Sequence, residues 1–174
     1  MQAPPTIKTR RLILRPPEPA DIEPLFEIQS DREAMRHTYV ARDRDATAEH
    51  LEAYAARFVE DGFAPWTAIL ESEQRVVGWG GLNRDPKAPH WGTEVSYFIH
   101  RAYWGRGLAT ELVQASLELA FRRLGLSEVL AFARPDNPAS AQVLKKTGFT
   151  LVRYVPELER DQYALGRRAW KDAT

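Results

Sequence analysis

Strand-like and helix-like hydrophobic patterns alternate along the first half of the chain. Residues 7–15 alternate between apolar and polar side chains and predict an edge strand. Asp21 is expected to cap a following helix, and residues 43–47 carry capping side chains for a second helix that ends at Gly62. The apolar stripe of this second helix is expected to comprise Leu51, Tyr54, Ala55, Phe58 and Val59.

The second half of the chain repeats strands and helices in turn. The predicted strands are, in order, Pro65–Leu70, Val76–Leu82, Glu94–His100, Glu128–Ala133, Phe149–Tyr154 and Tyr163–Trp170. A long helix is expected over Leu108–Leu124, and a shorter one opens at Asn137 and Pro138 and ends at Gly148. This alternation predicts an α/β fold with a mixed sheet.

A glycine-rich turn joins the strand Glu94–His100 to the long helix. Its sequence is Trp104-Gly105-Arg106-Gly107-Leu108-Ala109-Thr110. Backbone amides and the helix dipole attract anions at such a point, and the glycines let an anion approach closely. The turn therefore suits a phosphate or pyrophosphate. The alternative is a tight turn without a ligand, because short glycine motifs often match by chance.

Composition narrows the classes of function. The 174 residues, 44% of them hydrophobic, fit one globular domain over 1–174. Equal numbers of basic and acidic residues, 24 of each, argue against nucleic acid as the main ligand. The chain has no cysteine, which excludes disulfides and a thiolate nucleophile, and its four histidines lack metal-ligand spacing. We therefore expect no metal site.

The sequence also bears on location. Residues 1–5 are followed by no apolar run, and no stretch is apolar for long enough to cross a bilayer. Neither a signal peptide nor a membrane contact is expected, and the absence of cysteine fits a reducing compartment. We expect a cytoplasmic protein, as a monomer or a homodimer.

Two motifs, in this order, resemble the GNAT superfamily of acetyl-CoA-dependent N-acetyltransferases. The first runs from Glu94-Val95-Ser96-Tyr97-Phe98-Ile99 into the glycine turn, and the second is Asn137-Pro138-Ala139-Ser140 followed by residues 143–149. The chain looks most similar to the RimJ and RimL branch of ribosomal-protein N-terminal acetyltransferases, over about residues 9–170. The resemblance implies a mostly antiparallel central sheet with helices on both faces. It also implies a splayed pair of strands that holds the cofactor.

The resemblance further implies acetyl-CoA as co-substrate. Phe98 and Ile99 would pair through their backbone with the pantetheine arm and polarise the thioester carbonyl. Asn137 is a helix cap and, by its family position, would also hydrogen-bond the pantetheine chain. Arg101, Lys145 and Lys146 would either meet the CoA phosphates or form a solvated face. The backbone amides that would cradle the pyrophosphate belong to Trp104, Gly105, Arg106, Gly107, Leu108, Ala109 and Thr110.

The acid and base positions of the family are only partly filled. The usual tyrosine acid matches Leu144, so Ser140 is expected to donate a proton to the CoA thiolate, with helix capping as its alternative role. Glu94 is the candidate base, although its register is shifted by about one residue. A solvated charge, or a partner for an arginine, is the alternative for Glu94. A second family position for the base falls at Phe132, which cannot act as one.

These observations predict an enzyme that moves an acetyl group from acetyl-CoA to a primary amine by direct attack in a ternary complex. The acceptor is a protein N-terminus or a small-molecule amine, with His37 and Tyr39 as candidate contacts and Trp79 expected in the core. One alternative is a catalytically weak CoA-binding regulatory module. A different nucleotide-binding protein is a second alternative, but the turn lacks the lysine of a P-loop.

Overall fold

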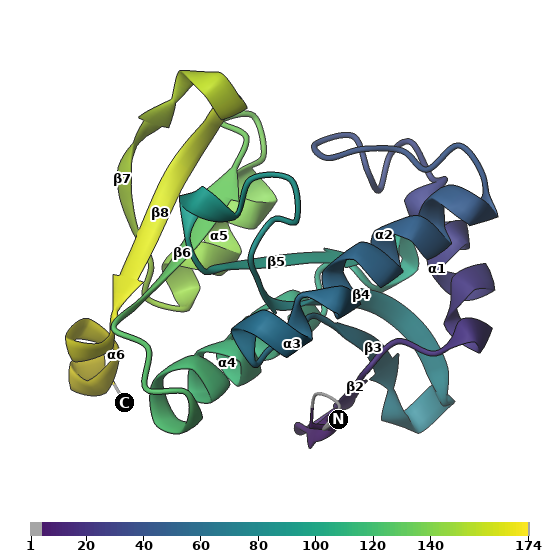
Figure 1. Cartoon of the computed structure of the whole chain (residues 1–174), viewed down its shortest axis with the longest axis horizontal. Coiled ribbons are helices and arrows are strands. Elements are labelled where there is room, and N and C mark those ends of the chain that lie inside the picture. The colour runs from purple at the N-terminus through teal and green to yellow at the C-terminus, as the bar shows by residue number, and fades with distance from the viewer. Residues whose placement is uncertain (1–4, 174) are drawn as a thin grey trace.

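A single eight-stranded sheet runs through the protein (Figure 1). The structure is a computed structural model that describes residues 5–173. The strand order is β1-β2-β3-β4-β5-β6-β8-β7, and all neighbours pair antiparallel except β5 and β6, which are parallel. The strands are β1 (Ile7–Lys8), β2 (Leu12–Arg15), β3 (Trp66–Leu70), β4 (Arg75–Asn83), β5 (Glu94–Ile99), β6 (Glu128–Ala133), β7 (Thr150–Val155) and β8 (Arg160–Gly166).

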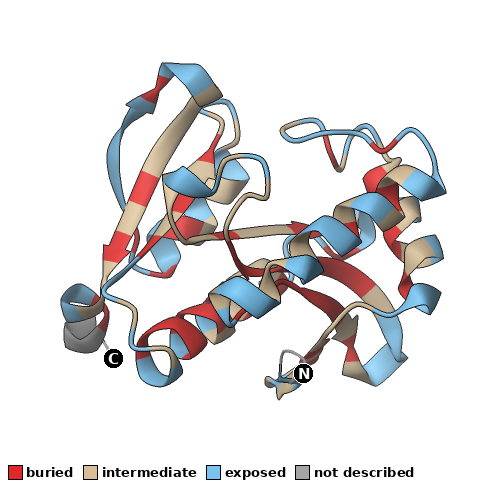
Figure 2. Cartoon of the chain, viewed as in Figure 1, coloured by how far each residue is buried: buried red, intermediate tan, exposed pale blue. Residues whose placement is uncertain are grey.

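Helices cover both faces of this sheet. The face toward α4 packs Leu108 and Leu112 against Val95 of β5, and the opposite face packs Leu25 of α1 against Phe98. Neighbouring residues of a strand point to opposite faces, so β5 contributes to both cores. Buried residues follow the sheet and the inner sides of the helices (Figure 2). The helices are α1 (Ile22–Gln29), α2 (Arg44–Ala56), α3 (Phe58–Asp61), α4 (Leu108–Glu118), α5 (Pro138–Lys146) and α6 (Arg167–Ala173).

The parallel pair β5 and β6 separates soon after it joins. Among the described residues, the two strands pair only where Glu94 meets Leu130, next to a hydrogen bond from the Leu130 amide to the Thr93 carbonyl oxygen at 2.9 Å. Beyond this point, Tyr97 of β5 and Phe132 of β6 line a cavity between the strands. The mixed, mostly antiparallel sheet with one splayed pair is thus confirmed.

The end of the chain differs from its prediction. The strand expected over residues 163–170 is wrong beyond Gly166, where β8 stops and α6 begins. Arg, Ala and Lys in this segment favour a helix. Trp170 packs against Phe121, with ring centroids 5.3 Å apart, so its burial comes from a helix contact and not from the sheet.

Two details of the first half of the chain also differ from their predictions. Ala55 and Val59 are exposed, Val59 by 70%, because the helix breaks at Arg57 between α2 and α3, so the expected stripe does not continue on one face. Asp21 precedes α1, but its carboxylate accepts from Arg15 and Thr67 and does not cap that helix. A buried ion pair therefore replaces the expected cap.

The long helix has the predicted extent, because α4 continues through a π-helical turn at Leu119–Arg123. Within residues 5–173, no helix is both long and apolar enough to cross a membrane. Residues 1–4, where a signal peptide was not expected, lie outside the described residues.

Candidate active site

The glycine turn between β5 and α4 presents unpaired amides. Gly105 and Gly107 have φ angles of 74° and 76°, a left-handed conformation that favours glycine. In the described part of the chain, the amides of residues 105–110 find no acceptor, whereas the Trp104 amide donates to the Arg101 carbonyl oxygen at 3.2 Å. Six consecutive amides at the start of a helix therefore fit an anion such as pyrophosphate, and the Trp104 amide does not belong to this set.

A side-chain network fixes the turn to the first strands. The Arg11 guanidinium donates to the Arg106 carbonyl oxygen at 2.7 Å and to Glu111 at 2.7 Å, and Thr9 donates to the same carboxylate at 2.6 Å. Burial alone would raise the pKa of Glu111, but the hydrogen bonds from Thr9 and Arg11 outweigh it and lower that pKa. A charged Glu111 thus holds the turn in place at neutral pH.

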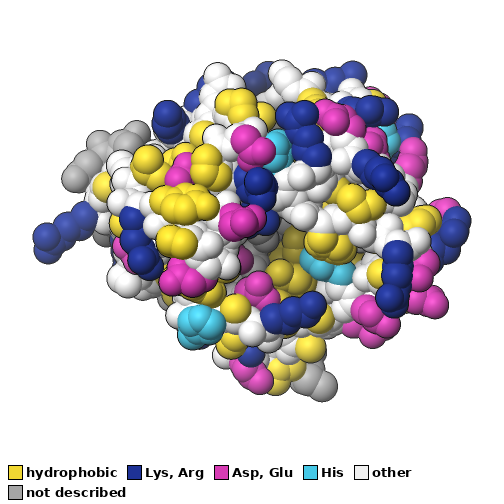
Figure 3. Space-filling model, turned by 90° about the horizontal axis from the view of Figure 1, so that it is seen from above, with side chains coloured by type: hydrophobic (Ala, Val, Ile, Leu, Met, Phe, Trp, Pro, Cys, Tyr) yellow, Lys and Arg dark blue, Asp and Glu magenta, His cyan; other side chains and the backbone are white. Residues whose placement is uncertain are grey.

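A cavity of about 360 Å³ lies where β5 and β6 diverge. Of the predicted site residues, it brings together Glu94, Phe98, Asn137 and Ser140, while Ile99 and the glycine turn lie outside its wall. His37 and Tyr39, the candidate acceptor contacts, also line it. Seen from above, the surface is hollowed at a place with hydrophobic side chains inside and charges of both signs around it (Figure 3).

Two hydroxyl groups meet where the cavity borders α5. Tyr97 Oη lies 3.1 Å from Ser140 Oγ, and the Ser140 amide donates to Asn137 Oδ1 at 3.1 Å, which confirms Asn137 as a helix cap. Burial raises the pKa of Tyr97 to about 12, against a smaller opposite effect of the Ser140 hydrogen bond. At neutral pH, Tyr97 is a protonated phenol that can donate through Ser140.

Tyr97 was missed by the sequence reasoning. It stands in β5, facing α5, whereas the family's usual tyrosine position is the buried Leu144 of α5 itself. Period-two alternation along β5 puts Tyr97 on the same face as Val95 and Ile99, toward α4 and α5. That alternation was the available signal, but the contact with Ser140 joins residues 43 positions apart.

Glu94 lies at the other end of the cavity, where β5 and β6 join. Burial, reinforced by Asp85, raises the pKa of Glu94 to about 7, and the charge of Arg160 opposes this rise. The β4–β5 register runs without a shift from Glu94 to Ile99, so Glu94 points to the face of Phe98 and not to that of Tyr97. A group that titrates near neutrality there suits a general base.

Five aromatic rings that lead from Tyr39 to Phe98 form one wall of the cavity. Neighbouring ring centroids are 4.8 to 5.4 Å apart. Trp79, expected in the core, is 3% exposed and packs there, and it lines the cavity as well. Burial lowers the pKa of His50 to about 4, so this ring is neutral. The wall comprises Tyr39, His50, Tyr54, Trp79 and Phe98.

The described residues contain no group of three or more His, Asp or Glu side chains that could hold a metal ion. The site therefore offers backbone amides, hydroxyl groups, one carboxylate of raised pKa and an aromatic wall. Such groups suit transfer between an anionic cofactor and a small polar acceptor.

Comparison with known proteins agrees with this geometry. YoaA of Bacillus subtilis (strain 168), an uncharacterized N-acetyltransferase, is 30% identical over 157 residues, which cover 83% of this chain and 82% of that protein. The crystal structure of an acetyltransferase from Agrobacterium tumefaciens has a TM-score of 0.81 at 25% identity, over 95% of this chain and 96% of that one.

The fold is also that of spermidine N-acetyltransferase from Vibrio cholerae, whose crystal structure is a complex with CoA and spermine. Its TM-score is 0.74 at 17% identity, with coverage of 92% of this chain and 98% of that one. A family model for the acetyltransferase (GNAT) domain matches residues 11–150, a range that contains the glycine turn, Glu94 and Ser140. The chain therefore belongs to the GNAT family of N-acetyltransferases, which use acetyl-CoA.

Proposed function

We propose that this protein transfers the acetyl group of acetyl-CoA to a primary amine by direct attack in a ternary complex. One observation carries the proposal: the cavity between β5 and β6 places a hydroxyl pair, Tyr97 and Ser140, at one end and a carboxylate of raised pKa, Glu94, at the other. A donor and an acceptor of protons on either side of a gap match the two proton transfers of amide formation.

The cofactor would enter from the glycine turn. The six unpaired amides of residues 105–110 would bind the pyrophosphate, and the pantetheine arm would follow the gap between β5 and β6. Asn137 has its Oδ1 engaged by the Ser140 amide, so its NH₂ group is the part left for the pantetheine chain. A backbone amide at Phe98 or Ile99 would support the oxyanion of the thioester carbonyl.

The chemistry follows from these positions. The amine nitrogen attacks the acetyl carbon, and a C–N bond forms as the C–S bond breaks. Glu94 receives the proton released by the nitrogen, directly or through one water molecule. The departing thiolate takes a proton from Ser140, which Tyr97 replaces. Tyr97 thus supplies the phenol that is missing at Leu144, and this argues against a catalytically weak CoA-binding module.

The finer assignments rest on the motifs. We propose that the protein belongs to the RimJ- and RimL-like branch, because a tryptophan opens the glycine turn and Ser140 is present. We also propose that it is a cytoplasmic protein of one domain, as a monomer or a homodimer. Spermine in the complex of the Vibrio cholerae relative supports an amine as acceptor for this chain as well.

The test is release of free thiol from acetyl-CoA in the presence of a panel of amines and short peptides. We expect turnover with at least one acceptor class. Calorimetry with acetyl-CoA alone is run in parallel. Tight binding without transfer to any acceptor would favour the regulatory module, and no binding would contradict both assignments.

A further inference from the structure

Arg160, the first residue of β8, is a half-buried cation in the wall of the cavity. Its Nη2 donates to the His37 carbonyl oxygen at 3.1 Å. No carboxylate of the described residues forms an ion pair with it. Because a guanidinium has five N–H donors, most of its hydrogen-bonding capacity remains for a ligand.

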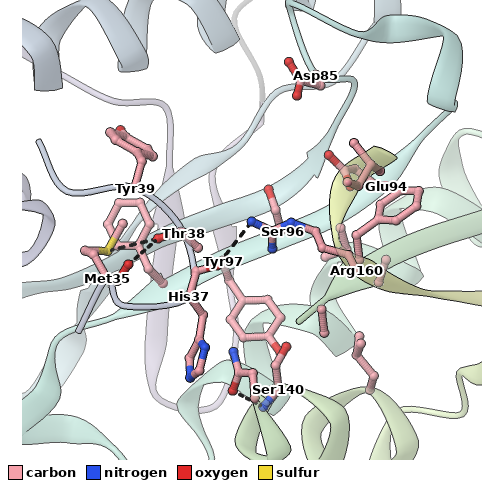
Figure 4. Close-up of a pocket in the computed structure, with 18 of the residues that line it drawn as sticks. Met35, His37, Thr38, Tyr39, Asp85, Glu94, Ser96, Tyr97, Ser140 and Arg160 are labelled. Atoms are coloured by element: carbon pink, nitrogen blue, oxygen red, sulfur yellow. Dashed lines mark hydrogen bonds between the residues drawn. The ribbon is translucent and has the colours of Figure 1, made fainter. Parts of the chain in front are cut away.

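The carboxylate that acts on the charge of Arg160 is Glu94 of β5, and β6 lies between their two strands in the sheet. Arg160 and Glu94 influence one another electrostatically, yet they do not form an ion pair. Figure 4 shows Arg160 pointing into the pocket between Glu94 and the segment of His37 and Thr38. The cavity thus holds a separated positive and negative group next to the reaction centre.

A simple amine would match only half of this arrangement. It would meet Glu94 but leave the half-buried guanidinium without an anion, and burial of an uncompensated charge is costly. A molecule with an amine and a carboxylate on neighbouring atoms matches both groups, and a carboxylate can bind a guanidinium through two parallel hydrogen bonds.

The rest of the cavity wall and the cavity volume restrict the class of possible ligands further. The ring cluster from Tyr39 to Phe98 offers an apolar surface for an aromatic or aliphatic group. The volume of about 360 Å³ must also admit the thioester end of the cofactor, which leaves room for one small acceptor.

We infer that the acceptor is a free α-amino acid with an aromatic or apolar side chain, whose carboxylate binds Arg160 while its amine faces Glu94. This inference rests on the proposed function and names its substrate class. The α-nitrogen forms the C–N bond as the C–S bond breaks, its proton goes to Glu94, and the carboxylate stays unchanged on Arg160.

The experiment compares three acceptors that share one side chain. L-Phenylalanine, its amide and 2-phenylethylamine are each tested by thiol release, and the tryptophan and leucine series repeat the comparison. We expect kcat/KM to favour the amino acid over both partners by ~10–100-fold, the range of a charged hydrogen bond. The amide is a stringent comparison, because its amine is a weaker base and more often deprotonated at neutral pH.

Arg160→Met should reduce this ratio of amino acid to amide by ~10-fold or more, and Arg160→Lys should restore part of it. Arg153→Met is the matched control, because Arg153 is exposed on β7 and bonds only Gln162 among the described residues. Calorimetry with acetyl-CoA verifies that each variant keeps its fold and cofactor site.

The inference is overturned if the amide or the decarboxylated amine is as good an acceptor as the amino acid. It is also overturned if Arg160→Met lowers the rates of all three acceptors equally. Acetylation of other amines would then leave the proposed function standing. No acetylation of any amine by protein that binds acetyl-CoA would contradict the proposed function itself.

Discussion

The glycine turn and the cavity beside it are built in different ways. The turn presents backbone amides from one short stretch of sequence, and the helix cap at Asn137 is equally local. The cavity is lined by side chains that come from distant parts of the chain, such as His37, Trp79 and Arg160. Under the proposed function, the difference teaches that a conformation binds the cofactor, whereas a combination of side chains selects the acceptor.

The largest effect is expected at Gly107, because a change there acts on the conformation itself. Gly107→Val should lower acetyl-CoA affinity by ~100-fold or more through loss of two or more amide contacts to a charged group. The control is Gly125→Val, since Gly125 has a similar φ of 69° and open space around a Cβ atom. Each variant should lose ~1–3 kcal/mol of stability from backbone strain. Calorimetry with equal acetyl-CoA affinity in both variants would contradict a phosphate cradle at Gly107.

The hydroxyl pair should govern turnover more than binding. Ser140→Ala and Tyr97→Phe should each lower kcat by ~100-fold, the lower end of the usual contribution of general acid catalysis, with little change in acetyl-CoA affinity. If the two hydroxyls act in series, the double variant should be no slower than the slower single variant. If steady-state kinetics showed that the losses of kcat in the two single variants multiply in the double variant, the two hydroxyl groups would act independently.

The role of Glu94 in the cavity can be tested through the pH dependence of the reaction rate. As a base with a pKa of about 7, it should make kcat at saturating acceptor rise from pH 5.5 to about pH 7 and then level off. Glu94→Gln should remove this step and lower the rate by ~10-fold or more. A step that persists in Glu94→Gln would assign the base to another group.

The raised pKa of Glu94 also makes the stability of the fold depend on pH. A raised folded pKa means that the folded state holds the proton more tightly, so this contribution to stability is present below about pH 4 and is lost as pH rises through about 7. Glu94→Gln should therefore stabilise the protein at pH 8 by on the order of 1–3 kcal/mol and much less at pH 4.5. Thermal unfolding at the two pH values measures this difference.

The smallest effect is expected where side chains only support the turn. Arg11→Met removes the donor to the Arg106 carbonyl oxygen and leaves Glu111 with Thr9 alone among its side-chain donors in the described residues. We expect a ~3–10-fold loss of acetyl-CoA affinity, since the glycines still permit the conformation. A loss as large as that of Gly107→Val would mean that the side chains, and not the backbone, determine the turn.

The same contrast explains what the sequence could predict. Gly105, Gly107 and the cap at Asn137 are local signals, because the residue type at one position decides a backbone angle or a hydrogen bond three residues away. Tyr97, Arg160 and the cavity role of Trp79 depend on partners that are brought close by the sheet, and no spacing rule reaches across it. Trp170 was misplaced for a related reason, since apolar residues near the end of a strand do not reveal which element buries them.

The contact between Trp104 and Ile99 should provide a fluorescence signal for cofactor binding. The indole of Trp104 is 45% exposed and donates from Nε1 to the carbonyl oxygen of Ile99 at 2.8 Å, the last residue of β5. The other four of the five tryptophans are less exposed, two of them below 4%. In the proposed complex the pantetheine arm reaches Ile99 and must either share this oxygen or release the indole into water, so the emission of Trp104 should respond to the cofactor before any acetyl group moves.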